Sequence, residues 1–333
     1  MSRPMSRVRK ITATLAFLIV VGLILPPFIN ANRFRKRLAT SASGALGRSV
    51  SIGDVQVRLL PRPGFDIKNF VVADDPAFSA EPLLRAPEVT AMLRITSLWR
   101  GKFEIARLNF KDPSLNLVRN ANGAWNIEGL LRYTSSLRTA PTGRTRPESN
   151  PRFPYIEADS GRINFKILQE KKVYALADTD FALWLESENQ WNMRLEGRPI
   201  RTDANLSDTG SVRMEGSMRR GETLEKSSLQ MRMTLTNSQL GQFSTLLSGR
   251  DHGWRGNVGI AAIAEGTLEK LNITADAKIV DFRRYDIASI EPLFLATHCT
   301  GALLKTAALN MQSRSASGPM LSNVNCSSPI GAT

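Results

Sequence analysis

Residues 229–235 read LQMRMTL, so an apolar side chain alternates with a polar one throughout the stretch. Successive side chains of a β-strand point to opposite faces of a sheet, and this pattern therefore predicts a strand with one buried face. The same alternation recurs at 258–264 and at 271–279, with a turn signal at 265–267 between them. The fold is thus expected to be built from amphipathic strands.

Further strand candidates extend this pattern over most of the chain, at 50–59, 65–72, 89–95, 103–110, 163–167, 181–185 and 191–195. Many are joined by short polar connections, which is typical of antiparallel meanders. At Gly53-Asp54 the alternation slips by one residue, which predicts a β-bulge. Helical patterns are few: 32–47, 127–137 and 238–247. We therefore predict a mainly β protein with one or more long, curved antiparallel sheets and few short helices.

The N-terminal region contains an uncharged run of nineteen residues, ITATLAFLIVVGLILPPFI at 11–29. A run of this length as a helix crosses a hydrocarbon core of about 30 Å. A cleaved signal peptide is the alternative, but such signals have shorter apolar regions and a small-x-small cleavage site. We expect an uncleaved transmembrane helix. Basic residues flank both ends, and the economical arrangement is a short cytoplasmic tail with the long body translocated.

These features predict an order of regions along the chain. Residues 1–10 form a basic cytoplasmic tail and 11–29 the transmembrane anchor. Residues 32–134 form a first β-subdomain with a leading amphipathic helix. Residues 135–152, rich in Pro, Ser, Thr and Arg, form a flexible linker. Residues 153–312 form a second β-rich subdomain, and 313–333 an irregular tail, for which a truncated reading frame or a fragment of a longer chain is one interpretation.

The formal net charge of +14 is concentrated near the predicted membrane anchor. The first 50 residues hold nine of the 44 Lys and Arg residues and none of the 30 acidic ones. Cations beside an anionic leaflet are favourable, so this charge fits a membrane surface. No basic helix with interleaved aromatics and no nucleic-acid motif follows, and we expect no nucleic-acid partner.

The two cysteines, Cys299 and Cys326, lie near the C-terminus. In an oxidising compartment they are expected to form a disulfide; two buried thiols are the alternative. The chain has two histidines and lacks HExxH, CxxC, GxSxG and phosphate-loop motifs. We therefore expect no catalytic residues, no metal site and no cofactor. The alternative hypothesis is an enzyme whose active-site residues are dispersed along the sequence.

A local signature then connects the chain to a family. Residues 112–127 read DPSLNLVRNANGAWNI, which predicts a hairpin with its tight turn at Asn122-Gly123. Together with the N-terminal apolar run, the basic amphipathic segment and the strand SIGDV at 51–55, this hairpin resembles the AsmA family of bacterial envelope proteins. Stretches at 161–165, 201–208, 253–256 and 281–286 resemble it as well. The chain is shorter than is usual for that family.

The resemblance implies an inner-membrane anchor, a periplasmic β-rich body and a role in outer-membrane biogenesis, with similarity to bridge-like lipid-transfer proteins. Because an apolar sheet face must be covered, it either packs against a second layer as an ordinary sandwich or holds acyl chains. We predict a non-enzymatic lipid-binding or lipid-conducting protein with phospholipid or another acyl-chain lipid, the inner membrane and outer-membrane assembly proteins as partners. An assembly scaffold or chaperone for outer-membrane proteins is the alternative. The predicted groove residues are Phe165, Ile167, Phe181, Leu183, Leu185, Met193, Leu195, Leu229, Met231, Met233 and Leu235.

Overall fold

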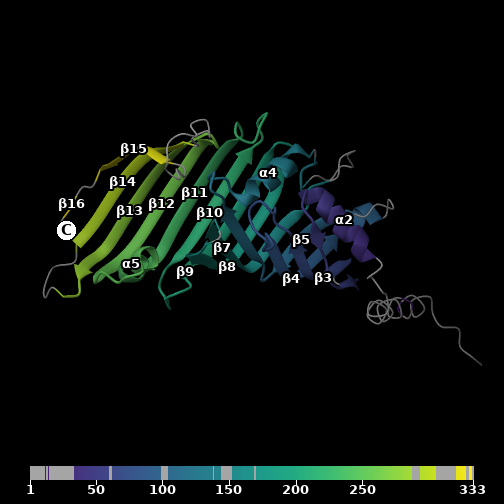
Figure 1. Ribbon diagram of the computed structural model, residues 1–333, viewed down its shortest axis with the longest axis horizontal. Coiled ribbons are helices and arrows are strands. Elements are labelled where there is room, and N and C mark those ends of the chain that lie inside the picture. The colour runs from purple at the N-terminus through teal and green to yellow at the C-terminus, as the bar shows by residue number, and fades with distance from the viewer. Residues whose placement is uncertain are drawn as a thin grey trace, which may run out of the picture.

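The computed structural model describes residues 12, 14, 34–59, 62–98, 104–137, 139–143, 152–168, 170–286, 293–304, 320–327 and 330–331. Within these ranges, sixteen strands form a single sheet (Figure 1). Its first part contains β1 (Val50–Ser51), β2 (Val55–Arg58), β3 (Gly64–Val72), β4 (Leu84–Leu93), β5 (Ile105–Lys111) and β6 (Ser114–Arg119). The prediction of a mainly β fold is confirmed.

The second part of the sheet is longer and follows chain order from β7 to β15. It contains β7 (Tyr155–Ile167), β8 (Glu170–Ser187), β9 (Gln190–Arg201), β10 (Ser211–Arg219), β11 (Ser228–Gln239), β12 (Trp254–Thr267), β13 (Lys270–Arg284), β14 (Leu293–Leu304), β15 (Met320–Ser327) and β16 (Ile330–Gly331). Every pair from β7 to β15 is antiparallel, as the short polar connections predict.

The expectation of a wholly antiparallel sheet is wrong at one place. β7 runs parallel to β5 and β6, with Phe110 beside Ala158 and Leu117 beside Phe165. The intervening segment returns the chain to the same end of the sheet before β7 starts, and a parallel neighbour needs such a crossover. This parallel pairing places the two predicted β-subdomains in one continuous sheet.

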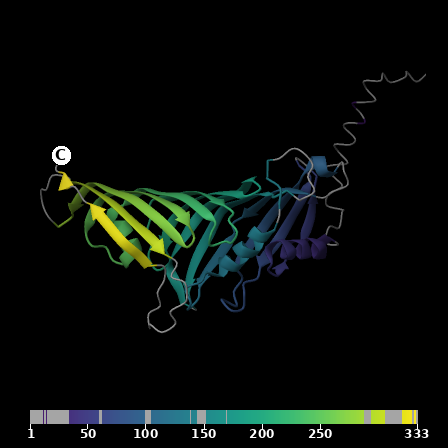
Figure 2. The ribbon, with the colours of Figure 1, turned by 90° about the horizontal axis from the view of Figure 1, so that it is seen from above.

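Three helices of more than one turn are described: α2 (Arg35–Leu46), α4 (Asn126–Ser136) and α5 (Leu240–Ser248). They match the predicted helical segments, and Figures 1 and 2 show them on the same side of the sheet. A short turn of helix, α3 (Ile95–Leu98), begins where the predicted strand 89–95 was expected to end. Among the described residues no helix is long and apolar enough to span a membrane. The predicted anchor at 11–29 lies outside them, apart from Thr12 and Thr14.

The predicted hairpin at 112–127 forms only in part. Gly123 adopts a φ of 80°, as the turn requires, but the returning arm is a single bridge between Arg119 and Trp125. Helix α4 starts immediately afterwards, because the Glu128 carboxylate accepts a 2.9 Å hydrogen bond from the Trp125 backbone N–H and so caps the first turn. β6 pairs instead with β4 and β7.

Several non-glycine residues in or beside the strands adopt the left-handed conformation. Asn69 in β3, Asp112 between β5 and β6, Ser160 in β7 and Asp178 in β8 all have φ between 48° and 54°. The pairing register of β7 with β8 shifts on both sides of Gly161. Bulges of this kind increase local twist, and Asn and Asp tolerate the left-handed region best among non-glycine residues. The predicted interruption at 53–54 is confirmed, since Val50 and Val55 are both buried on either side of it.

Candidate functional site: the apolar face of the sheet

One face of the sheet is apolar along almost its whole length. The pairing registers join a row of residues that share one side of the sheet, because directly paired residues point the same way. From β2 to β14 this row is Val55, Ile67, Val89, Phe110, Ala158, Phe181, Leu195, Met214, Met233, Ala262, Ala275 and Cys299. We call the side of the sheet that carries this row the apolar face.

A second row lies two residues away on the same face. It consists of Val57, Phe65, Ala91, Leu108, Ile156, Leu183, Met193, Gly216, Met231, Ala264, Ile273 and Gly301. Neither row contains a charged or hydrogen-bonding side chain apart from the cysteine. Twelve strands of the sheet therefore present two adjacent, uninterrupted apolar rows.

The eleven predicted groove residues all lie on this face. Leu229 and Leu235 flank the two rows on β11, and Leu185 pairs with Trp191 beside them. Phe165 pairs with Leu117, which points to the same side as Leu115, two residues earlier on β6. Leu115 packs against the buried core, so Phe165 lies on the apolar face, and Ile167 follows it on the same side. Leu185, Leu195 and Leu235 are buried and the other eight are half-buried. The sequence pattern thus identified which side chains share a face.

The apolar face is covered unevenly. At the N-terminal end of the sheet, α2 and the residue before it contribute Leu38, Leu46 and Phe34. These side chains pack against a buried cluster that includes Val89 and Ala91. Those two strand residues are 1% and 0% exposed. This part of the apolar face is therefore an ordinary hydrophobic core, closed by a helix and not by the second sheet of a sandwich.

Toward the C-terminal end the covering thins. Helix α4 reaches across to the connection between β10 and β11, where Arg132 pairs with Glu225 at 2.7 Å and Arg220 donates a 3.1 Å hydrogen bond to the Leu137 carbonyl. Helix α5 lies against the start of β12, where Val258 is buried. On β13, however, the five apolar residues Leu271, Ile273, Ala275, Ala277 and Ile279 are all half-buried and none is buried.

The opposite face is polar and carries a network of ion pairs and hydrogen bonds. Arg107 pairs with Glu157 at 2.9 Å, and its guanidinium lies 5.0 Å from the ring centroid of Tyr155. Further along, Arg213 pairs with Glu196 at 3.3 Å and Gln230 donates to Glu265 at 2.7 Å. Exposed pairs of this kind contribute little to stability, but they keep this face hydrated. The sheet is therefore amphipathic along much of its length, although Val118 and Ala182, which are 1% and 3% exposed, also lie on this opposite face.

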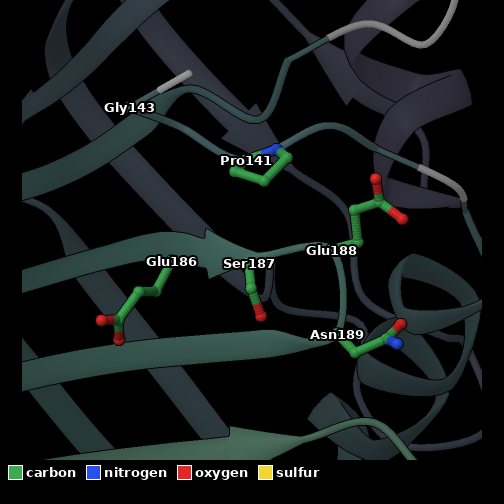
Figure 3. Close-up of a pocket in the computed structure, with 6 residues that line it drawn as sticks. All are labelled: Pro141, Gly143, Glu186, Ser187, Glu188 and Asn189. Carbon is green, nitrogen blue, oxygen red and sulfur yellow. The ribbon is translucent and has the colours of Figure 1, made fainter.

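Two surface depressions border the sheet. The larger, about 610 Å³, surrounds the turn between β8 and β9 and is lined by polar residues (Figure 3). The carboxyl groups of Glu186 and Glu188 point in opposite directions there, so they do not form an acid–base pair (Figure 3). The second, about 450 Å³, is lined from the polar face by residues such as Trp184, Glu215 and Arg232. Its lining also includes Met193, Gly216 and Met231 of the second apolar row.

The two histidines lie on separate elements of the structure. His252 contacts the Ser248 hydroxyl at 3.1 Å in the loop after α5, whereas His298 on β14 contacts Asp276 at 2.7 Å. The part of the chain that the structure describes holds no cluster of three metal-ligating side chains. The register places Cys299 opposite Cys326, and Cys299 is disulfide-bonded.

The architecture defines a class of protein: a long amphipathic β-sheet whose apolar face is packed by helices at one end and only partly covered at the other. The chain belongs to the AsmA family, whose family model matches residues 5–207. This membership points to a role in the bacterial envelope and in outer-membrane biogenesis. Neither a curated protein nor a solved structure matches the chain.

Proposed function

We propose that this protein is a non-enzymatic, inner-membrane-anchored periplasmic protein that holds or conducts phospholipid acyl chains on the apolar face of its sheet. The observation that carries the proposal is the pair of uninterrupted apolar rows, which leave the packed core near α2 and continue onto half-buried strands as far as β14. Each methylene transferred from water to such a surface gains about 0.8 kcal/mol, so acyl chains need no polar site to bind there.

Residues 11–29 supply the anchor in this proposal, and the basic residues that flank them lie against anionic headgroups. The polar face of the sheet stays in water, and the apolar face supplies the lipid path. Lipid enters or leaves where the covering is thinnest, between β10 and β14. No chemical step is required, so the protein needs no cofactor or metal.

A glycine in the middle of the apolar face offers a direct test. Gly216 on β10 lies between Met193 and Met231, and a Cβ at this position would meet Met193 Cγ at 3.3 Å and Met193 Sδ at 3.7 Å. The flexible thioether can move aside, and the Gln230 carbonyl oxygen lies 3.5 Å from the new Cβ, an ordinary contact, so Gly216→Phe places an aromatic ring on the apolar face. Ser217→Phe places the same ring on the polar face of the same strand and is the matched control.

The experiment compares the full chain and both variants, extracted in mild detergent, by native mass spectrometry. We expect phospholipid to co-purify with the wild type and with S217F, and to fall at least about fivefold in G216F. Absence of lipid from the wild type, or equal lipid in the two variants, would refute the proposal. Selective crosslinking to unfolded outer-membrane proteins, without bound lipid, would favour the scaffold alternative.

A further inference from the structure

Methionine is concentrated on one small part of the apolar face. The sequence contains ten methionines, and the side chains of six are described. Five of these six lie on the apolar face of three consecutive strands: Met193 on β9, Met214 and Met218 on β10, and Met231 and Met233 on β11. The sixth, Met92 on β4, pairs with Gly64 and Arg107 and points to the polar face.

These five side chains form a contiguous surface, which we call the methionine patch. Met214 and Met233 are directly opposed, and Met193 lies over Gly216, the residue that pairs with Met231. All five are half-buried. The neighbouring β12 positions are the small residues Ala262 and Ala264, so the patch borders a strip of short side chains.

Packing alone does not account for this composition. Strand positions favour β-branched and aromatic residues, which the N-terminal core uses at Val55, Ile67 and Val89. Methionine has three rotatable bonds and a polarizable thioether, so it packs against partners of different shapes and specifies none of them. Proteins that bind several partners use methionine-rich surfaces for this reason.

We infer that the methionine patch makes the apolar face indifferent to acyl-chain unsaturation and length, so that the protein takes phospholipids of mixed chain composition. This inference rests on the proposed function, because it concerns the shape of the lipid chains and not whether they bind. The kink of a cis double bond displaces several methylenes sideways, and flexible thioethers can follow it where branched side chains cannot.

The test replaces all five methionines by leucine, which keeps apolar character and nearly conserves volume. A second variant carries only Met214→Leu and Met233→Leu, in case the fivefold replacement fails to fold, and Met92→Leu is the control. Binding of dimyristoyl- and dioleoyl-phosphatidylglycerol to each full-length protein in detergent is measured by fluorescent-lipid displacement. In parallel, methionine 13C-methyl NMR spectra follow addition of each lipid.

For the wild type and Met92→Leu we expect Kd values for the two lipids within about threefold of each other. The five-leucine variant should favour the saturated lipid by at least about tenfold, and the double variant by an intermediate factor. Both lipids should shift the five patch methyl signals and leave that of Met92 unchanged. Lipid binding with an unchanged selectivity ratio, or with unshifted patch signals, would overturn this inference alone. Failure of the wild type to bind either lipid would overturn the proposed function.

Discussion

The side-chain amide of Asn126 donates a 2.6 Å hydrogen bond to the Asp74 carboxylate, which lies 52 residues earlier in the chain. The Asp74 side chain is 0% exposed, and Asn126 is 0% exposed as well. The same amide donates to the Asn116 carbonyl at 2.9 Å, and its oxygen accepts from the Val118 N–H at 3.0 Å. One asparagine thus ties the start of α4 to β6 and to the loop after β3.

Asn126→Ala should lower the free energy of unfolding by about 3 kcal/mol, because it leaves a buried carboxylate and a buried backbone N–H without this partner. Asn109→Ala is the matched control, since Asn109 donates to Asp159 at 2.8 Å in an exposed position. That variant should lose less than about 1 kcal/mol. Urea unfolding measures both, and equal losses would contradict a central role for Asn126.

Two glycines should respond to alanine with opposite signs. Gly256 in β12 has a φ of 138°, and a Cβ there would lie 2.8 Å from the Val280 carbonyl oxygen. Gly256→Ala should therefore destabilise the fold by about 1–3 kcal/mol. Gly44 lies inside α2 with nothing within 4 Å of a Cβ, so Gly44→Ala should stabilise by up to about 1 kcal/mol. Thermal unfolding of the two variants tests the contrast, and a change of the same sign in both would count against it.

Stability at acidic pH should depend in part on Asp251. Hydrogen bonds from the Arg255 guanidinium, and then from the Gly253 backbone N–H, lower the pKa of the Asp251 carboxyl below its usual value of 3.8. The unfolded state therefore binds the proton more readily, so this contribution is present above about pH 4 and is lost as the pH falls through the folded pKa.

Asp251→Asn should destabilise the protein at pH 6 but have little effect at about pH 2.5. The difference should stay below about 1 kcal/mol because the pair is exposed. Unfolding curves at the two pH values provide the measurement. An effect of Asp251→Asn that does not change with pH would show that the ion pair is not its cause.

The cysteines provide a test of the C-terminal part of the sheet. Cys299 is disulfide-bonded and faces Cys326 across β14 and β15. We expect neither thiol of the full chain to react with maleimide under denaturing conditions until a reductant is added. A crosslink between these positions should contribute about 3–4 kcal/mol in the chain-entropy model. Reduction should therefore lower the stability of the wild type and leave the stability of a Cys299→Ser, Cys326→Ser variant unchanged. Maleimide labelling of both thiols before any reductant is added would exclude the disulfide.

Much of the candidate site could be predicted from local pattern. The alternation at 229–235 placed Leu229, Met231, Met233 and Leu235 on one face, and the same rule collected residues from β7, β8 and β9 on it. This works because side-chain direction in a strand depends only on the position along that strand. Gly47 and Gly249, both with positive φ at helix ends, likewise follow from local backbone chemistry.

The covering of that face could not be predicted in this way. Nothing near Met231 in the sequence indicates that α2 closes the apolar face over Val89 and leaves β13 half-buried. The methionine patch also passed unnoticed, because Met193 and Met233 are 40 residues apart and meet only through the pairing of three strands. A count of methionines restricted to apolar-face positions would have found it.

Local patterns predicted many of the strands and their apolar sides, the helical segments and the family, because each depends on short-range periodicity or on motifs within a few dozen residues. They did not predict β10, β14 or β15. Three features emerge only from the folded chain: β7 runs parallel to β5 and β6, both β-rich regions share one sheet, and that sheet is left half-covered at β13. Those features depend on register and on contacts between distant segments, and a period of two residues is the same whichever neighbour a strand pairs with.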